Sequence, residues 1–185
     1  MYFGYLLLRT GALEEARIAL AMASMMPAKE QVKNRIKAVR ALVYWKEGNL
    51  DDAIDTLENL IEDFKTTSVY QNLGLFYVLK GDKEKALDFN LEAYDYNCDD
   101  LVIMDNLAEA YMLCDMQDEA EEMYKKLLEN EPHFPEAYYG YGLLLIQKGE
   151  KEKGLSLMKE SLDKRFSYLS VMQKEDVEEL IKKYE

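Results

Sequence analysis

The chain has 185 residues, of which 49% are hydrophobic, and it carries a formal net charge of −13 at pH 7. The hydrophobic content excludes an intrinsically disordered chain, and the acidity disfavours binding to nucleic acid or to a bare anionic membrane, both of which attract basic surfaces. The two cysteines form neither a disulfide framework nor a zinc signature, and no apolar run reaches the ~18 residues of a membrane-spanning helix.

A short residue pattern recurs along the chain at a nearly constant interval. Its anchors are Gly11, Gly48, Gly81, Asp115 and Gly149, separated by 37, 33, 34 and 34 residues. Small residues lie five positions after each anchor (Ala16, Ala53, Ala86, Ala120, Gly154) and seven before it (Gly4, Ala41, Gly74, Ala108, Gly142). This period indicates one supersecondary unit stacked on copies of itself, which buries its core only against its neighbours.

In chain order, the pattern predicts a pair of helices in each repeat. The predicted pairs are 2–10 with 12–26, a long helix ending at Lys46 or Glu47 with 50–64, 68–80 with 83–96, 101–114 with 117–130, and 135–148 with 151–164. Pro27 breaks the first pair, and the three extra residues of the 37-residue step fall there. Each anchor is expected to end a first helix in the left-handed conformation.

Beyond Phe166 the repeat stops, and a different helix is predicted. Ser170 and Gln173 fit a capping box, and Val177, Leu180, Ile181 and Tyr184 follow with the spacing of an amphipathic helix. We expect residues 170–185 to form a capping helix that covers the apolar end of the array. A helix that binds a partner is the alternative interpretation.

The repeated residues resemble the tetratricopeptide repeat family, whose unit is a helix–turn–helix of 34 residues. The third copy carries Leu73-Gly74, Tyr77, Gly81, Ala86 and Ala93 at the family's positions, and the fourth carries Leu107-Ala108, Tyr111, Ala120, Tyr124 and Pro132. Asn90 departs from the pattern, because that position is normally large and apolar. The resemblance implies an all-α fold, a right-handed α-solenoid in a single domain over 1–185: a partial repeat at 1–27, repeats at about 28–66, 67–100, 101–134 and 135–166, and the capping helix.

The resemblance also implies where a partner binds, because the first helix of each pair lines the concave groove. The residues that it places there are Arg35, Leu42, Gln71, Asn72, Leu75, Asp105, Asn106, Glu109, Glu136 and Tyr139. Asn72 and Asn106 occupy equivalent positions of successive repeats, where the family's asparagines hold the backbone of an extended peptide; a solvated asparagine is the alternative. The basic residues of the family's clamp for chaperone C-termini are missing. Asp105, Glu109 and Glu136 instead favour a partner with a basic segment.

Support for an enzyme is weak. The single histidine, His133, lies between prolines in a connection, and the chain has no glycine-rich phosphate loop or pair of metal-binding histidines. Adjacent acidic residues such as Asp51 and Asp52 do not face each other on a helix. We therefore expect no catalysis, no cofactor and no metal.

The sequence predicts a non-catalytic scaffold that holds a peptide or helix of another protein in its concave groove. Such a scaffold is expected in the cytoplasm, as a monomer or a weak homo-oligomer, without direct membrane contact. If the first repeat has the same spacing as the others, its first helix would begin about three residues before Met1. The chain is therefore either a fragment or a native start with a shortened helix. The alternative function is self-association, or a role as an accessory domain of a longer protein that is anchored to a membrane or enzymatic.

Overall fold

A computed structural model describes residues 2–185, and all the regular secondary structure in this range is helical. The helices are α1 (Tyr2–Arg9), α2 (Leu13–Met25), α3 (Glu30–Lys46), α4 (Leu50–Ile61), α5 (Thr67–Lys80), α6 (Lys83–Tyr96), α7 (Leu101–Leu113), α8 (Gln117–Leu128), α9 (Glu136–Gln147), α10 (Lys151–Ser161) and α11 (Lys174–Tyr184). The predicted helices are confirmed to within a few residues at their ends. The long helix after Pro27 is also confirmed, since α3 has 17 residues.

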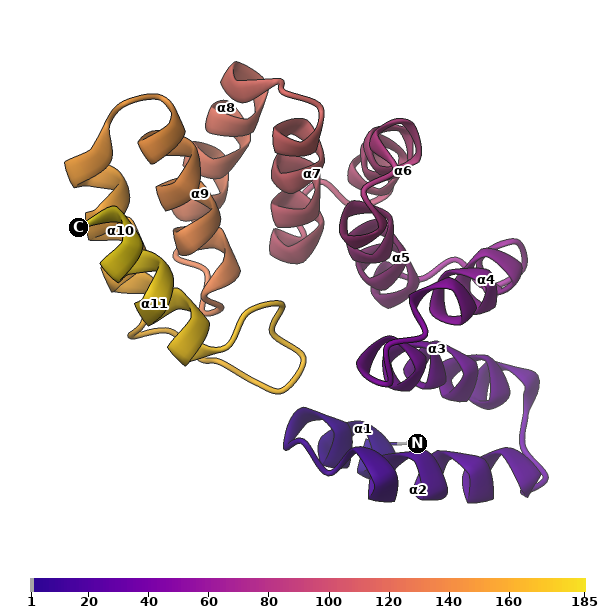
Figure 1. The fold of residues 1–185 in the computed structure, drawn as a ribbon. Helices are drawn as coiled ribbons and strands as arrows, with labels where there is room; N and C mark the ends of the chain where they lie inside the picture. Colours follow the sequence, from indigo (N-terminus) through magenta and orange to yellow (C-terminus); the bar gives the residue numbers. More distant parts are fainter. Residues whose placement is uncertain (1) are drawn as a thin grey trace.

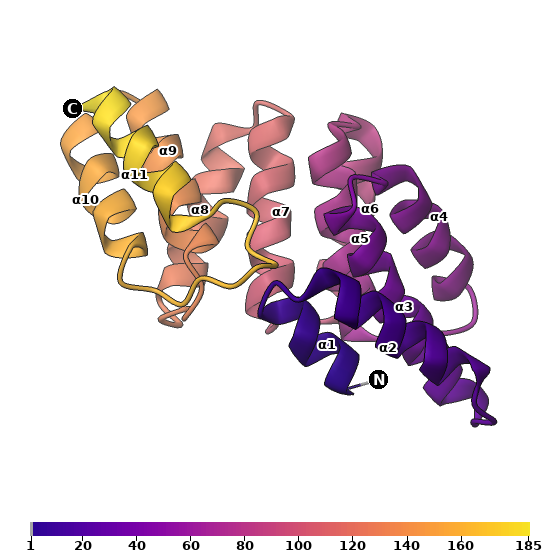
Figure 2. The ribbon, with the colours of Figure 1, turned by 60° about the horizontal axis from the view of Figure 1, so that its bottom comes forward.

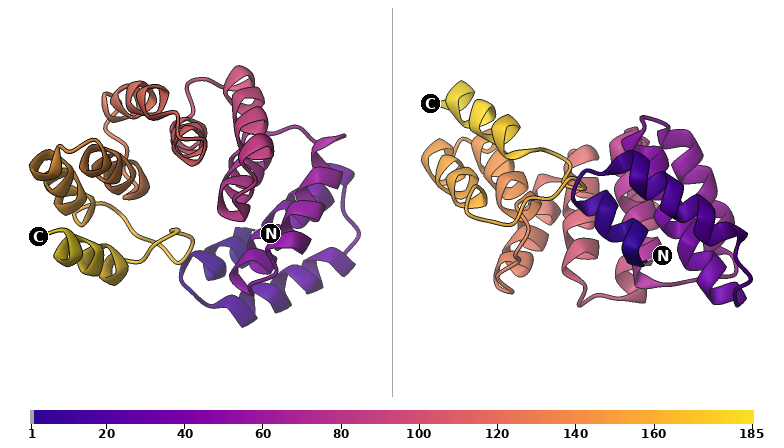
Figure 3. Two further views of the ribbon diagram at one scale, coloured as in Figure 1. Left: turned by 45° about the horizontal axis from the view of Figure 1, so that its top comes forward. Right: turned by 90° about the horizontal axis from the view of Figure 1, so that it is seen from below.

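The helices form an α-solenoid of helix–turn–helix units that curves into an incomplete ring (Figure 1). Helices α3, α5, α7 and α9 line the inside of the curve, and α4, α6, α8 and α10 lie on the outside. The loop between α10 and α11 reaches back toward α1, as the turned views in Figures 2 and 3 also show. Because of this curvature, residues from several repeats face one central space.

The anchor residues end the first helix of each pair in the predicted left-handed conformation. Gly11, Gly48, Gly81 and Gly149 have φ of 76–88°, and Asp115 has φ of 61°. In four of the five turns, the residue after the anchor donates its N–H to the carbonyl four residues before the anchor, for example Glu150 to Leu145 at 2.8 Å. This bond satisfies a carbonyl that the end of the helix leaves free.

Asn90 departs from the expected packing of the repeats, whereas Gly142 and Gly154 follow it. Asn90 is fully buried and donates its amide to the carbonyls of Ala86 (2.8 Å) and Gly74 (3.2 Å), so a polar side chain bridges α5 and α6 where the family has an apolar one. At α9 and α10 the helices approach most closely through Gly142 and Gly154. A Cβ added to Gly154 would lie 2.4 Å from the Gly142 carbonyl oxygen.

The capping box at the start of the last helix was predicted at the wrong residues. Helix α11 begins at Lys174, and the capping box joins Gln173 and Asp176, with the Gln173 N–H donating to the Asp176 carboxylate at 2.8 Å. Ser170 belongs to the preceding turn, where its hydroxyl accepts the Ser167 N–H. The helix still covers the end of the array, because Val177 and Ile181 pack with Met158 of α10.

Candidate binding pocket

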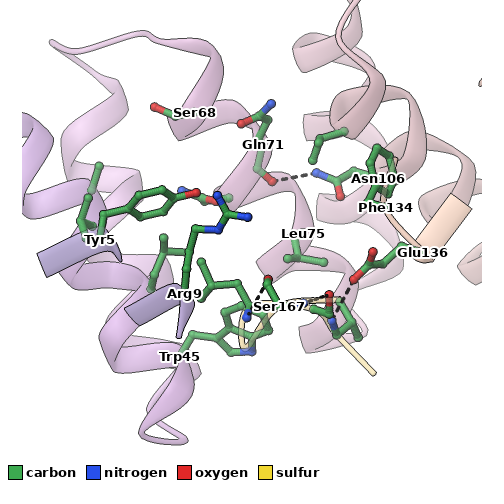
Figure 4. Close-up of a pocket in the computed structure, with 18 of the residues that line it drawn as sticks. Tyr5, Arg9, Trp45, Ser68, Gln71, Leu75, Asn106, Phe134, Glu136 and Ser167 are labelled. Carbon is green, nitrogen blue, oxygen red and sulfur yellow. Dashed lines mark hydrogen bonds between the residues drawn. The ribbon is translucent and has the colours of Figure 1, made fainter. Parts of the chain in front are cut away.

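The inside of the ring contains a pocket of about 780 Å³, which we call the central pocket. It is lined by the inner faces of α1, α3, α5 and α7, by the start of α9, and by the segment between α10 and α11. Tyr5 and Arg9 reach into it from α1, opposite Asn106 and Glu136 (Figure 4). Residues from both ends of the chain therefore contribute to one cavity.

Residues 165–173, the C-terminal strap, close the ring over the central pocket. The Tyr168 N–H donates to the Arg9 carbonyl (3.3 Å), the Lys46 Nζ donates to the Ser170 carbonyl (3.2 Å), and the Val171 N–H donates to the Glu136 carboxylate (3.2 Å). The strap thus joins the first two repeats to the last. A partner must enter from the open faces of the ring or displace the strap.

Lys46 is the main cation at this closure. Its Nζ lies 3.8 Å from the ring centroid of Trp45 and 5.3 Å from that of Tyr168, so two aromatic faces stabilise the charge. Partial burial lowers the Lys46 pKa, and the nearby Glu136 carboxylate opposes this shift. Lys46 therefore fixes the strap through a hydrogen bond, ring contacts and long-range attraction.

The pocket combines apolar side chains with charged ones. Ala38, Val39, Leu42, Trp45, Leu75 and Val102 supply the apolar surface. Arg9 of α1, Arg35 of α3 and Arg165 of the strap also line the pocket. Within residues 2–185, none of these three guanidinium groups has a carboxylate partner within 4.0 Å. The pocket therefore offers both apolar contact and unpaired cationic groups.

Asp105, Glu109 and Glu136 also line the pocket and form the acidic wall, which brings together the three carboxyl groups expected from the sequence. Asp105 is only 6% exposed, and its Oδ1 has no hydrogen-bond partner among the described residues. Burial raises the pKa of all three groups, with that of Glu109 reaching about 7, and repulsion from neighbouring carboxylates raises the pKa values of Asp105 and Glu109 further. The acidic wall is therefore harder to ionise than exposed carboxyl groups are.

The two predicted peptide-holding asparagines differ in their surroundings. The Asn106 amide donates to the Gln71 carbonyl at 2.7 Å, and the Gln71 amide donates to the Asp100 carboxylate at 2.8 and 3.0 Å. Asn106 and Gln71 thus join α5 to α7, although both still line the pocket. Asn72 also lines the pocket, and its side chain makes no hydrogen bond within residues 2–185. Of the two, Asn72 has the amide that is free for a partner.

Tyr139 lies outside the central pocket, unlike the other nine residues predicted from the sequence. It is 4% exposed and packs with Met158, Val177 and Ile181. The reason is helix α11, which covers this part of α9 and places Tyr139 in the core. The repeat pattern assigned Tyr139 to the groove because it does not include α11.

Several pocket residues had no signal in the sequence. Tyr5 and Arg9 come from the incomplete first repeat, Phe134 from a connection, and Arg165 from the strap. The repeat register assigns groove positions only to complete repeats, so it could not place these four. Trp45, the only tryptophan, could have been noted as an unusual residue at the end of an inner helix.

The described residues contain no group of three or more His, Cys, Asp or Glu side chains arranged to hold a metal ion. Over residues 2–185, none of the helices combines the length and the apolar character needed to cross a bilayer.

The fold and the concave pocket define a helical-repeat protein. The sequence profile of the tetratricopeptide repeat family matches residues 39–99 and 118–167, which together make up more than half of the chain. The chain therefore belongs to the tetratricopeptide repeat family.

Among curated proteins, the chain is similar to the photosystem I assembly protein Ycf3 of Prochlorococcus marinus (strain MIT 9303), with 28% identity over 138 residues that cover 65% of this chain and 79% of Ycf3. A thermophilic TPR protein of Thermus thermophilus has a similar structure, with a TM-score of 0.80, 18% identity, and coverage of 100% of this chain and 96% of that one. YrrB, described as a TPR protein with an unusual peptide-binding site, matches with a TM-score of 0.59, 21% identity, and coverage of 88% and 83%. At these identities the two structures show a shared fold.

Proposed function

We propose that this protein is a non-catalytic interaction scaffold that binds a peptide segment of a partner protein in its central pocket. The observation that supports this most is the pocket itself, which combines apolar side chains with unpaired arginines and the acidic wall. Peptide sites commonly combine apolar contacts for affinity with a few polar groups that fix orientation. The peptide-binding site described for YrrB and the assembly role described for Ycf3 are consistent with such a function.

The closed ring limits how a partner segment could bind. An extended peptide cannot lie freely along the whole concave face, because the C-terminal strap crosses the space between the first and last repeats. We propose that a short segment or a chain end enters beside α5, with Leu75 and Leu42 as apolar contacts and the Asn72 amide on its backbone. A segment with basic residues suits the acidic wall.

Filling the mouth of the pocket is expected to abolish partner binding. Ser68 is exposed, lines the pocket and lies in the first turn of α5, so Ser68→Trp should block entry without disturbing the core. The measurement is affinity capture from the source cell's lysate with wild type and variant, followed by titration of the captured protein's synthetic segment. We expect at least a tenfold loss of affinity, from a steric cost above about 1.4 kcal/mol.

The matched control is Asp55→Trp, which places the same side chain on the exposed outer surface of α4. It should bind like wild type. Equal loss in both variants, or loss in neither, would exclude the central pocket as the binding site.

Self-association is a second candidate function, because the helices of the first repeat expose large apolar side chains. Phe3 and Leu6 of α1 are 67% and 57% exposed, and Met22 and Met25 of α2 are 64% and 85% exposed. Neighbouring copies could cover such side chains. A molar mass that rises with concentration in sedimentation experiments, and falls again in a Met22→Lys variant, would favour this function; a constant monomer mass would exclude it.

A cytoplasmic location is part of the proposal. Cys98 and Cys114 are free thiols, as is usual in a reducing compartment.

A further inference from the structure

The acidic wall brings three carboxyl groups together in one pocket, and within residues 2–185 none of them forms an ion pair with the arginines that also line it. Within residues 2–185, neither Asp105, Glu109 nor Glu136 has a Lys or Arg nitrogen within 4.0 Å, although elsewhere the chain pairs many of its acids, such as Asp118 and Glu121 with Lys148. Burying unpaired carboxyl groups costs free energy, so packing alone does not account for them.

Asp105 is the least satisfied of the three. It is only 6% exposed, lines the central pocket, and leaves Oδ1 without a hydrogen-bond partner among the described residues. Its neighbour Asn106 joins α5 to α7 through the Gln71 carbonyl, whereas within residues 2–185 no bond from the Asp105 side chain holds two helices together. A buried acid without a hydrogen-bond partner is unusual, and a cation from a bound segment would satisfy it.

Almost every titratable group around Asp105 is also acidic or neutral. These groups are Glu109 on α7, Tyr124 on α8, and Glu136 and Tyr139 on α9. Among the cations, Lys46 of α3 acts on Glu136 but donates its hydrogen bond to the strap carbonyl of Ser170, and Arg9, Arg35 and Arg165 line the same pocket without pairing with these acids in the described residues. The strap itself contributes the Val171 N–H to Glu136. The carboxyl groups of the acidic wall therefore outnumber the cations that act on them.

We propose that the acidic wall is the subsite for one organic cation of the bound segment, with Asp105 as its main acceptor. This inference rests on the proposed peptide-binding function and specifies its ligand: the ammonium or guanidinium of a basic side chain, or the ammonium of a chain N-terminus. Leu75, Val102 and Phe134 also line the pocket and offer apolar contact to the stem of a long basic side chain (Figure 4 labels Leu75 and Phe134).

Cation binding at this wall is coupled to proton release. Burial and mutual repulsion raise the carboxyl pKa values in the empty pocket, with that of Glu109 reaching about 7, so these groups retain protons to a higher pH than exposed carboxyl groups do. A bound cation favours the ionised form and lowers these pKa values again. Affinity should therefore rise as the pH rises from the ordinary carboxyl range toward 7, and level off once the empty wall is ionised.

The test uses the full chain and four small probes, of which three are the Nα-acetyl N-methylamides of lysine, arginine and norleucine. Glycine N-methylamide represents a chain N-terminus. Binding is followed by NMR of the side-chain carboxyl carbons at about pH 6 and about pH 8, on either side of the neutral range. We expect at least one cationic probe to bind, more tightly at the higher pH, and the neutral norleucine probe to bind at least tenfold more weakly.

Asp105→Asn should weaken binding of the cationic probe about tenfold and reduce its pH dependence, while the protein becomes more stable to heat because a buried acid is removed. Glu109→Gln provides a second variant if the first does not fold. Asp95→Asn, on the exposed surface of α6, makes the same charge change outside the pocket and should bind like wild type.

Equal affinity for norleucine and the cationic probes, or unchanged binding in both pocket variants, would overturn the cation subsite. The proposed function would survive that result if Ser68→Trp still abolished capture of the partner. Binding of the glycine probe alone would assign the subsite to a chain N-terminus instead of a side chain.

Discussion

Replacing Gly154 with alanine is expected to lower the free energy of unfolding by about 2 kcal/mol. A Cβ at this position would lie 2.4 Å from the Gly142 carbonyl oxygen and 2.6 Å from a side-chain carbon of Ile146, so α9 and α10 must move apart. Such overpacking costs about 3 kcal/mol at the upper end, and the better helix propensity of alanine returns about 1 kcal/mol. Urea unfolding monitored by circular dichroism measures the difference.

Ser156→Ala is the matched control for Gly154→Ala, because Ser156 lies on the same helix with its side chain exposed. It should leave stability unchanged or raise it slightly, since alanine favours a helix. An equally stable Gly154→Ala protein would mean that the two helices separate at no cost, and that the small residues of this repeat are not required for packing.

The close contact at Gly154 also shows how far the sequence predicts this fold. The small residues five positions after and seven positions before each anchor could be recognised in the sequence, because packing within each repeat requires them at fixed positions. The same register predicted the left-handed conformation at Asp115, where the side chain replaces the usual glycine. Helix pairs, turns and repeat order follow from residues within one 34-residue unit, so the sequence carries enough information to predict them.

The candidate site was less predictable, because it depends on contacts between distant parts of the chain. The register correctly placed residues such as Asn72 and Asp105 on inner faces of helices. It could not show that Asn106 is bound to the Gln71 carbonyl or that α11 covers Tyr139. It also gave no information on the strap, whose bond from Lys46 to Ser170 joins residues 124 positions apart.

The acidic wall illustrates the same limit in energetic terms. Three acids on neighbouring helices were predicted to face the groove, and they do so in the structure. Their burial depends on how the ring closes, and burial is the main cause of their raised pKa values. A sequence pattern gives the charge of a surface, whereas the protonation of its groups depends on the surrounding atoms.

Replacing Tyr168 with alanine is expected to open the ring. The Tyr168 side chain packs beside Gly11, and its ring lies 5.3 Å from the Lys46 ammonium, so it forms much of the contact between the strap and the first two repeats. Losing a half-buried aromatic side chain should cost about 2 kcal/mol, below the value for a fully buried one. The amides of α1 should then exchange faster with deuterium, and X-ray scattering should give a larger radius of gyration.

The control for ring opening is Tyr168→Phe, which keeps the aromatic ring that packs on Gly11 and faces Lys46. It should exchange like wild type, because no hydrogen bond from the Tyr168 hydroxyl is formed within residues 2–185. Slow exchange at α1 in Tyr168→Ala would show that the strap does not hold the first repeat. If only Tyr168→Ala exchanges fast, the strap holds the first repeat. If this variant also binds the partner faster than wild type does, the strap is a barrier that the partner displaces on entering the central pocket.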